Sequence, residues 1–265
     1  MRVIPVMSTK GGVGKSKVCV GLGRALKAKG FHIGFLDVDW VAPNLHLELG
    51  VDRDSGMKLS QEVGDIIQPV LSPEGFLLVS SAFLYPPDQA ISMDEDSKIR
   101  DIEEISAPGV VAWGEVDYLL MDTPPTTARF VQTALAIDNL YGVVLVCQPA
   151  GSAIADLYRT VSLLKDLHIP IIGLVGNQVH LICPHGEKIN LFDMGESELV
   201  VFCETFHIPY LGSIPHVVPS MGLPPLDGIT DRMLSGLPIY LPKDKTSNLP
   251  YKLLVALARR KKEGR

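Results

Sequence analysis

A glycine-rich segment near the start of the chain has the clearest potential for chemistry. Residues 10–16 read KGGVGKS, after a short apolar segment and directly before an amphipathic one. Glycines let consecutive backbone N–H groups curl around a phosphate, and the N-terminus of a following helix adds partial positive charge. Lys15 can reach the terminal phosphates of a nucleotide, and the Ser16 hydroxyl can coordinate Mg²⁺. We therefore predict a phosphate-binding loop, although Thr9 stands where the standard pattern has its first glycine.

Acidic side chains at the ends of two predicted strands can complete such a site. Residues 35–39 read FLDVD, so Asp37 and Asp39 are two positions apart and share a face if the strand includes both. Residues 118–122 read YLLMD, an apolar strand that ends in Asp122 before two prolines. A nucleotide site needs such groups for Mg²⁺-bound water and for orienting an attacking water. Three carboxylates in this order after a phosphate loop predict a nucleotide-hydrolysing site.

The elements that must position these residues follow an alternating pattern. Short apolar segments predict buried parallel strands at residues 3–7, 33–36, 76–79, 118–121, 143–147 and 171–175. Amphipathic segments predict helices at 16–29 and at 152–167, the second capped by Ser152. This alternation predicts an α/β fold, a doubly wound and mainly parallel sheet with helices on both faces.

Two regions interrupt the alternation. Residues 51–114 are mixed and contain an acidic stretch at 94–104, which we interpret as a solvated helix face or a loop on an insertion. Residues 221–250 are rich in proline and glycine, which indicates a surface excursion before a last helix at about 251–262. Without a repeat or a linker, we expect residues 1–265 to form one domain.

The composition excludes several classes of protein. Of 265 residues, 46% are hydrophobic and 20% are charged, which excludes disorder for most of the chain. The net charge of −6 argues against a dedicated nucleic-acid binder. Four scattered cysteines are typical of reduced thiols in the cytoplasm, residues 1–8 build no signal-peptide core, and no apolar run reaches the ~18–20 residues of a membrane span.

The phosphate loop carries a second lysine, Lys10, and in this it resembles the deviant Walker A loop of the MinD/ParA/Mrp class of P-loop ATPases. The resemblance implies ATP, Mg²⁺ and a homodimer in which Lys10 reaches the partner's nucleotide while Lys15 contacts its own. It assigns Asp37 to the metal environment, Asp39 to the attacking water and Asn177 to the adenine base. The residues expected to bind nucleotide are Gly11, Gly12, Val13, Gly14, Lys15, Ser16, Lys17 and Asn177. Those expected in catalysis are Lys10, Lys15 and Asp39, and those near Mg²⁺ are Ser16, Asp37 and Asp122.

Other segments are similar to one branch of this class, the Mrp/ApbC branch. They are residues 37–44, 113–125, 177–188 and 212–215. Members of that branch are homodimeric ATPases that carry or assemble iron–sulfur clusters, with a Cys-Pro-x-Cys motif in each subunit. Here Cys183-Pro184-His185 is followed by Gly186, so the second cysteine is missing. A dimer would offer two thiolates where a [4Fe–4S] cluster takes four, although His185 can supplement them.

The sequence is compatible with three functions. The chain is a carrier of iron–sulfur clusters, an accessory ATPase that matures metallocofactors without its own cluster, or a positioning ATPase that acts on a membrane or a partner. For the first two we expect a metalloprotein or assembly-factor partner. Only the basic residues 259–262 after an apolar stretch suggest membrane binding, and a docked final helix explains them better. We expect no stable cluster in the isolated protein, with Cys183 as a candidate ligand of a cluster or of zinc and with Cys19 and Cys203 buried.

Overall fold

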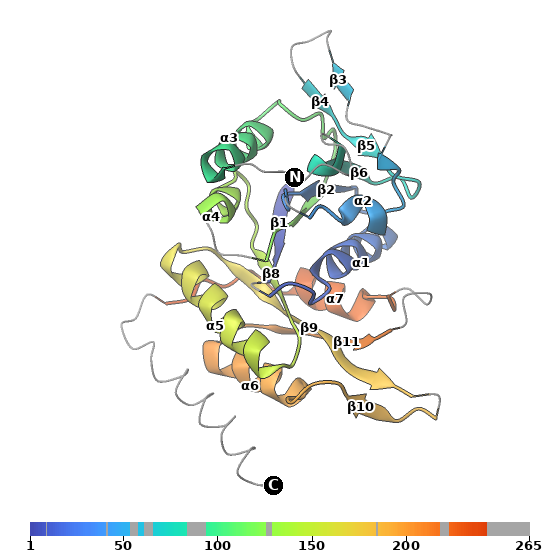
Figure 1. The fold of residues 1–265 in the computed structure, drawn as a ribbon, viewed down its shortest axis with the longest axis vertical. Coiled ribbons are helices and arrows are strands. Elements are labelled where there is room, and N and C mark those ends of the chain that lie inside the picture. Colours follow the sequence, from blue (N-terminus) through green and yellow to red (C-terminus); the bar gives the residue numbers. More distant parts are fainter. Residues whose placement is uncertain are drawn as a thin grey trace.

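A central β-sheet organises the computed structural model, which describes residues 1–8, 10–40, 42–53, 58–60, 66–83, 94–125, 129–183, 185–217 and 223–242. Across this sheet the strands follow the order β10 (Lys188–Asn190), β9 (Ile171–Ile182), β8 (Val143–Cys147), β1 (Arg2–Met7), β7 (Tyr118–Asp122), β2 (Ile33–Asp37), β6 (Leu77–Ser80) and β5 (Val70–Leu71). A further strand, β11 (Tyr210–His216), pairs with β9. Figure 1 shows this sheet running through the middle of the molecule.

The inner strands of the sheet are parallel. β1 lies between β7 and β8, and β2 lies between β7 and β6, all in parallel register. Every residue of β2, β7 and β8 is buried, as expected for apolar strands covered on both faces. All six predicted strands are confirmed. The segment predicted as 171–175 continues to Ile182, because its outer part pairs with β10 in an antiparallel ladder.

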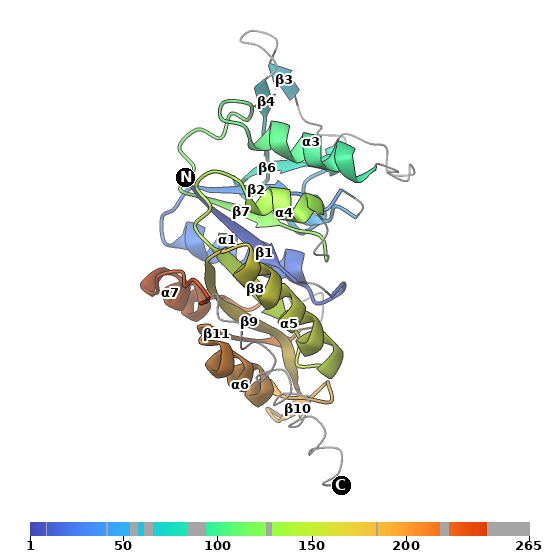
Figure 2. The same cartoon turned by 90° about the vertical axis from the view of Figure 1, so that its left-hand side faces the viewer.

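Helices cover both faces of the sheet, as predicted. On one face lie α1 (Lys15–Ala28), α2 (Leu45–Glu48) and α7 (Asp227–Ser235); on the other lie α3 (Glu95–Ser106), α4 (Arg129–Leu135), α5 (Gly151–Asp166) and α6 (Glu196–Phe206). Figure 1 shows the two helical layers on opposite sides of the strands, and in Figure 2 the layer of α3 to α6 faces the viewer. Alternate side chains of β1 pack against the two helical layers. Val3 and Met7 belong to one hydrophobic core, and Ile4 and Val6 belong to the other.

The start of α5 corrects one prediction. We expected Ser152 to cap this helix, but the residue at the N-cap position is Ala150, whose side chain makes no capping hydrogen bond. The carboxylate of Asp193, distant in sequence, instead accepts a hydrogen bond from the backbone N–H of Gly151 at 3.1 Å. The Ser152 hydroxyl is free for another partner, which belongs to the candidate site.

The described parts of the two irregular regions contain regular elements. Within 51–114 the structure has β5, β6, the short 3₁₀ helix η2 (Ser81–Phe83), and a separate hairpin of β3 (Lys58–Ser60) and β4 (Ile66–Gln68). The acidic stretch forms α3, which Asp94 caps by accepting a hydrogen bond from the backbone N–H of Ser97 at 2.8 Å. The predicted excursion at 221–250 is wrong for residues 227–235, because Ile229 and Met233 are buried and make α7 a core helix.

The predicted last helix at 251–262 lies outside the described residues. Among the helices that the structure describes, none is long and apolar enough to cross a membrane.

Candidate functional site

The phosphate loop lies between β1 and α1, and its glycines have the backbone that such a loop requires. Gly12 and Gly14 both have positive φ angles, 77° and 80°. A Cβ at Gly14 would also lie 2.5 Å from Asn177 Nδ2, so this position admits no side chain without a shift. Val13 is buried, whereas Gly11 and Gly12 are exposed, as is Lys17 in the first turn of α1. The loop therefore offers exposed backbone in front of the N-terminus of α1.

Lys15 and Ser16 converge on one carboxylate, that of Asp122. The Lys15 Nζ donates to Asp122 Oδ1, and the Ser16 Oγ donates to Asp122 Oδ2 at 2.5 Å. Lys15 is 7% exposed and Asp122 is 1% exposed, so this is a buried ion pair. The contact follows from the topology, because β7 is the parallel neighbour of β1 and ends at Asp122, beside the loop that leaves β1. Three predicted site residues are thus brought together.

Asp37 is the last residue of β2 and is fully buried. Its Oδ2 accepts hydrogen bonds from Ser80 Oγ and from the backbone N–H of Leu45, each at 3.2 Å. Its Oδ1 accepts from the backbone N–H of Asp39 at 3.1 Å. Burial, followed by the negative charge of Asp122, raises the pKa of Asp37 to about 8. The carboxyl of Asp37 therefore organises the loop after β2 as well as facing the charge of Asp122.

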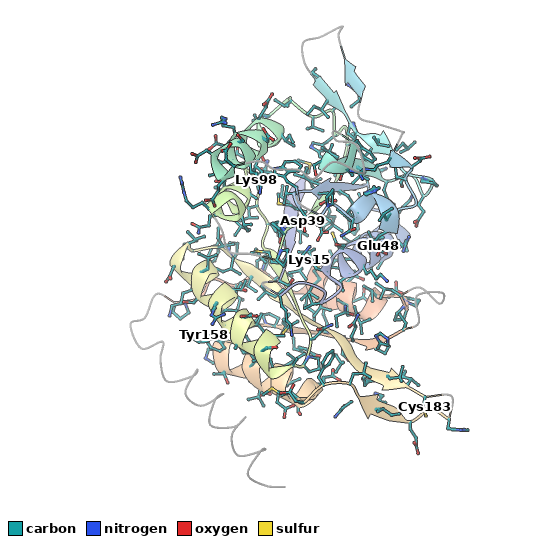
Figure 3. The ribbon with its side chains drawn as sticks, viewed as in Figure 1. Lys15, Asp39, Glu48, Lys98, Tyr158 and Cys183 are labelled. Carbon is teal, nitrogen blue, oxygen red and sulfur yellow. The ribbon has the colours of Figure 1, made fainter. Side chains whose placement is uncertain are left out.

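Asp39 lies in the loop between β2 and α2 and is half-buried. We expected Asp37 and Asp39 to share a strand face, and this is wrong because β2 ends at Asp37. The turn beyond the strand orients Asp39 instead, and its Oδ1 accepts a hydrogen bond from the backbone N–H of Ala42 at 3.2 Å. Figure 3 shows Asp39 in the same central region as Lys15.

Asn177 lies within β9 instead of after it. Its Nδ2 donates to the carbonyl oxygen of Val13 at 2.7 Å, so the side chain contacts the phosphate loop. Its Oδ1 is buried and has no hydrogen-bond partner among the described residues. A buried acceptor of this kind is costly unless a donor reaches it. The orphaned oxygen therefore fits a bound group that carries an N–H donor.

Lys10 extends from the phosphate loop toward α5. Its Nζ donates a hydrogen bond to Ser152 Oγ at 2.9 Å. This contact accounts for Ser152, which the sequence suggested as a helix cap. Lys10 and Lys15 thus have separate partners, Ser152 in α5 and Asp122 at the end of β7.

Two glutamines at the edge of the site were missed by sequence reasoning. Gln148 follows β8 and donates from Nε2 to Gln178 Oε1 at 2.6 Å. Gln178 has a φ of 54°, an uncommon backbone conformation for a residue with a side chain. The only available signal was positional, since ligands of open α/β sheets bind beyond the carboxyl ends of the strands.

Cys183 lies in the turn between β9 and β10, away from Lys15 (Figure 3). The turn is closed by the backbone, as the N–H of Cys183 donates to the carbonyl of Glu187 and the N–H of Gly186 donates to that of Cys183, both at 2.9 Å. Cys183 is half-exposed, and His185 is exposed. In the part of the chain that the structure describes, no three His, Cys, Asp or Glu side chains are grouped to hold a metal ion.

The other cysteines are confirmed as buried thiols. Cys19, Cys147 and Cys203 are all buried. Burial raises the pKa of Cys19 well above its ordinary value and raises the pKa of Cys147 and of Cys203 to about 12. These three thiols are therefore expected to react more slowly with reagents than the half-exposed thiol of Cys183.

Comparisons with known proteins agree with this geometry. The family model described as ParA, NUBPL iron-transfer P-loop NTPase, matches residues 1–221. An iron-sulfur cluster carrier protein from Methanococcus maripaludis is 37% identical over 215 residues, which cover 80% of this chain and 72% of that protein. A cytosolic Fe-S cluster assembly factor NUBP2 homolog from Nematostella vectensis is 34% identical, covering 80% of this chain and 78% of that protein.

Solved structures show the same fold. A nucleotide-binding protein from Archaeoglobus fulgidus in complex with ADP has a TM-score of 0.67 and 27% identity, covering 89% of this chain and 88% of that chain. The MinC:MinD cell division complex from Aquifex aeolicus matches with a TM-score of 0.61 and 19% identity, covering 92% of this chain and 99% of that chain. The chain belongs to the ParA/NUBPL family of iron-transfer P-loop NTPases.

Proposed function

We propose that this chain is a Mg²⁺-dependent ATPase that acts as a homodimeric switch in the carriage or assembly of iron–sulfur clusters. The observation that carries the proposal is the convergence of Lys15 and Ser16 on the buried carboxylate of Asp122. A lysine and a hydroxyl at the start of a helix, beside a strand-end carboxylate, are the groups that P-loop nucleotide sites use. The ADP in the related Archaeoglobus fulgidus structure supports the same ligand here.

Nucleotide binding follows from these contacts. An incoming phosphate competes with Asp122 for the Nζ of Lys15, and the exposed N–H groups of the loop donate hydrogen bonds to the phosphate oxygens. Ser16 and Asp122 then present oxygen ligands to Mg²⁺, which prefers them. When bound there, Mg²⁺ would neutralise negative charge on the phosphate groups.

Base selection rests on Asn177. Its orphaned Oδ1 accepts a hydrogen bond from the exocyclic amino group of adenine. Guanine carries a carbonyl oxygen at the corresponding ring position, and two acceptors facing each other in a buried site are unfavourable. We therefore assign ATP as the substrate in preference to GTP.

Hydrolysis requires a positioned water and a cation near the terminal phosphate. Asp39 orients the water from the loop after β2, and Asp37 holds that loop through the backbone N–H of Asp39. Lys10 supplies the cation to the partner's nucleotide, and it gives up its bond to Ser152 to do so. A cation brought across an interface stabilises charge in the transition state, as an arginine finger does.

The cluster chemistry centres on Cys183. Relatives are named as an iron-sulfur cluster carrier and as a cytosolic assembly factor, which supports the same process, a cytoplasmic location and a metalloprotein or assembly-factor partner. One thiolate per chain gives a homodimer two of the usual four, so a transferred cluster needs further ligands from that partner, from His185 or from a small thiol. Cys183 is therefore a transient ligand, and the isolated protein holds no stable [4Fe–4S] cluster.

A second candidate is an accessory ATPase that never ligates a cluster. It is favoured by the lack of a grouped ligand set around Cys183 in the described residues. The positioning function has less support, because the likeness to MinD at 19% identity shows the fold alone.

The two candidates are separated by anaerobic purification with iron and sulfide analysis, together with ATP turnover and transfer of a cluster to an apo iron–sulfur protein from ferrous iron and sulfide supplied in the assay. We expect Mg²⁺-dependent turnover that Cys183→Ala leaves intact, and cluster transfer that Cys183→Ala abolishes. Cys203→Ala, which removes a buried thiol, is the matched control and keeps both activities. Transfer that survives Cys183→Ala favours the accessory ATPase. A stable cluster of about four irons per dimer that depends on Cys183 would contradict the transient role. Failure of the parent to hydrolyse ATP would overturn the whole proposal.

A further inference from the structure

Strand β9 is divided into two parts at Gln178. Up to Asn177 the strand lies in the parallel sheet, where it pairs with β8 and β11. From His180 to Ile182 it pairs with β10 in an antiparallel hairpin, and Cys183 lies in the turn of that hairpin. The register with β11 shifts between the two parts, since Ile214 is opposite Asn177 and His216 is opposite Leu181. The strand therefore carries extra residues at the junction, as a β-bulge does, and bulges re-aim the strand beyond them.

The backbone of Gln178 is held in an unfavourable conformation. Its φ of 54° lies in the left-handed region, which a residue with a Cβ populates roughly 5- to 30-fold less readily than its ordinary conformations. Such a conformation persists only where the surroundings hold it, and it is often found at switch regions. In the structure the surroundings include Gln148, whose Nε2 donates to Gln178 Oε1 at 2.6 Å.

The same junction touches the phosphate loop. Asn177 donates to the carbonyl oxygen of Val13 at 2.7 Å. Gln178 Nε2 lies 3.8 Å from the position that a Cβ at Gly14 would occupy. A change in the loop when a nucleotide binds therefore reaches the junction through two neighbouring side chains.

The other side of the junction carries the half-exposed thiol of Cys183. Cys183 is five residues beyond Gln178, which corresponds to about 17 Å of extended strand. Figures 1 and 3 show the β9–β10 hairpin projecting from the body of the molecule, with Cys183 at its end. A small rotation at Gln178 therefore produces a large displacement of Cys183.

We propose that Gln178 is a hinge and Gln148 its latch, through which nucleotide occupancy of the phosphate loop repositions the hairpin that carries Cys183. This inference rests on the proposed function, because it needs a nucleotide in the loop. With the loop empty, the Gln148–Gln178 hydrogen bond holds the bulge and fixes one hairpin orientation. A nucleotide that displaces Val13 and engages Asn177 shifts the balance at Gln178 toward a second orientation.

The thiol of Cys183 provides the readout, because the other three cysteines are buried. The full chain is labelled with a maleimide, with and without saturating Mg-ADP, and calorimetry on the same samples measures binding. In the parent we expect ADP to change the labelling rate of Cys183 by about two- to tenfold, the range that one hydrogen bond supplies. Gln148→Leu, which removes the latch and keeps its bulk, should bring the ratio of the two rates to about one.

Gln178→Gly is the second variant, since glycine adopts the left-handed backbone without cost and lacks the amide. It should also bring the ratio to about one. His207→Gly is the matched control, because His207 has a φ of 55° at the end of α6, away from the phosphate loop. This control should keep the parent ratio.

Two results overturn the inference while the proposed function stands. One is ADP binding by the parent with no change in labelling rate; the other is a parent-like ratio in both glutamine variants. If calorimetry detects no binding of ADP to the parent, the proposed function fails, and the inference fails with it.

Discussion

Asp122→Asn tests how the buried carboxylate controls the phosphate loop. The substitution keeps the shape of the side chain and removes the charge that Lys15 contacts. With side chains 8% and 1% exposed, Lys15 and Asp122 are poorly screened by solvent. Removing one partner of a buried ion pair costs about 3–5 kcal/mol, because the other charge is left uncompensated. We therefore expect the free energy of unfolding without nucleotide to fall by about that amount.

The effect on ADP affinity should depend on Mg²⁺. Without Mg²⁺, the phosphates no longer compete with a carboxylate for the Nζ of Lys15. A charge-assisted hydrogen bond contributes about 1.5–3 kcal/mol, so ADP affinity should rise by up to about 10- to 150-fold. With Mg²⁺ present, the variant lacks the negative charge of the carboxylate. The positive charges of Mg²⁺ and Lys15 would then lie near each other without compensation. The enhancement of ADP affinity by Mg²⁺ should therefore fall toward one.

Calorimetric titration of ADP, in excess Mg²⁺ and in a chelator, measures both effects, and urea unfolding measures the stability. Asp231→Asn is the control, because Asp231 pairs with Lys29 at 2.6 Å on the surface with its side chain 65% exposed. Loss of such a surface pair costs about 0–1 kcal/mol and should leave ADP binding unchanged. If Mg²⁺ strengthens ADP binding equally in Asp122→Asn and in the parent, the assigned role of Asp122 is wrong.

Two further predictions concern Lys10 and His46. Lys10→Ala should keep ADP affinity but slow ATP turnover and ATP-dependent dimerisation, measured by phosphate release and sedimentation; hydrolysis at the parent rate would exclude a role across the dimer. Burial lowers the pKa of His46, so below about pH 6.5 the unfolded chain binds a proton that the folded chain does not bind. The free energy of unfolding therefore falls by up to about 1.4 kcal/mol for each unit by which the pH is lowered. His46→Phe, which can keep the edge contact with Phe83, should flatten the loss in urea unfolding between pH 7 and pH 5; an unchanged slope would assign the loss to other groups.

Local patterns were sufficient to predict the strands and the phosphate loop. The strands are short, apolar and buried on both faces, so composition alone marks them. The loop was recognisable because glycines, Lys15 and Ser16 are contiguous in sequence and stand between a strand and a helix. Asp122 was placed correctly because β7 ends at it and is the parallel neighbour of β1.

Several of the errors and omissions involve contacts between residues that are distant in sequence. Asp193 contacts the start of α5 from 42 residues away, so no local pattern could separate it from Ser152 as the capping group. The extension of β9 depends on pairing with β10, and the latch between Gln148 and Gln178 joins two strands. For α7 a local signal existed, since Ile229 and Met233 are spaced for one helix face, but the flanking prolines and glycines obscured it.

The proposed function requires the phosphate loop to bind a nucleotide through Lys15. Calorimetric titration of Mg-ADP into the parent and into Lys15→Ala measures this contact, with Lys29→Ala as the surface control and an unfolding curve to verify that each variant is folded. We predict one site per chain in the parent, with affinity lowered about 10- to 150-fold in Lys15→Ala and unchanged in Lys29→Ala. A folded Lys15→Ala protein that binds ADP as tightly as the parent would contradict the account.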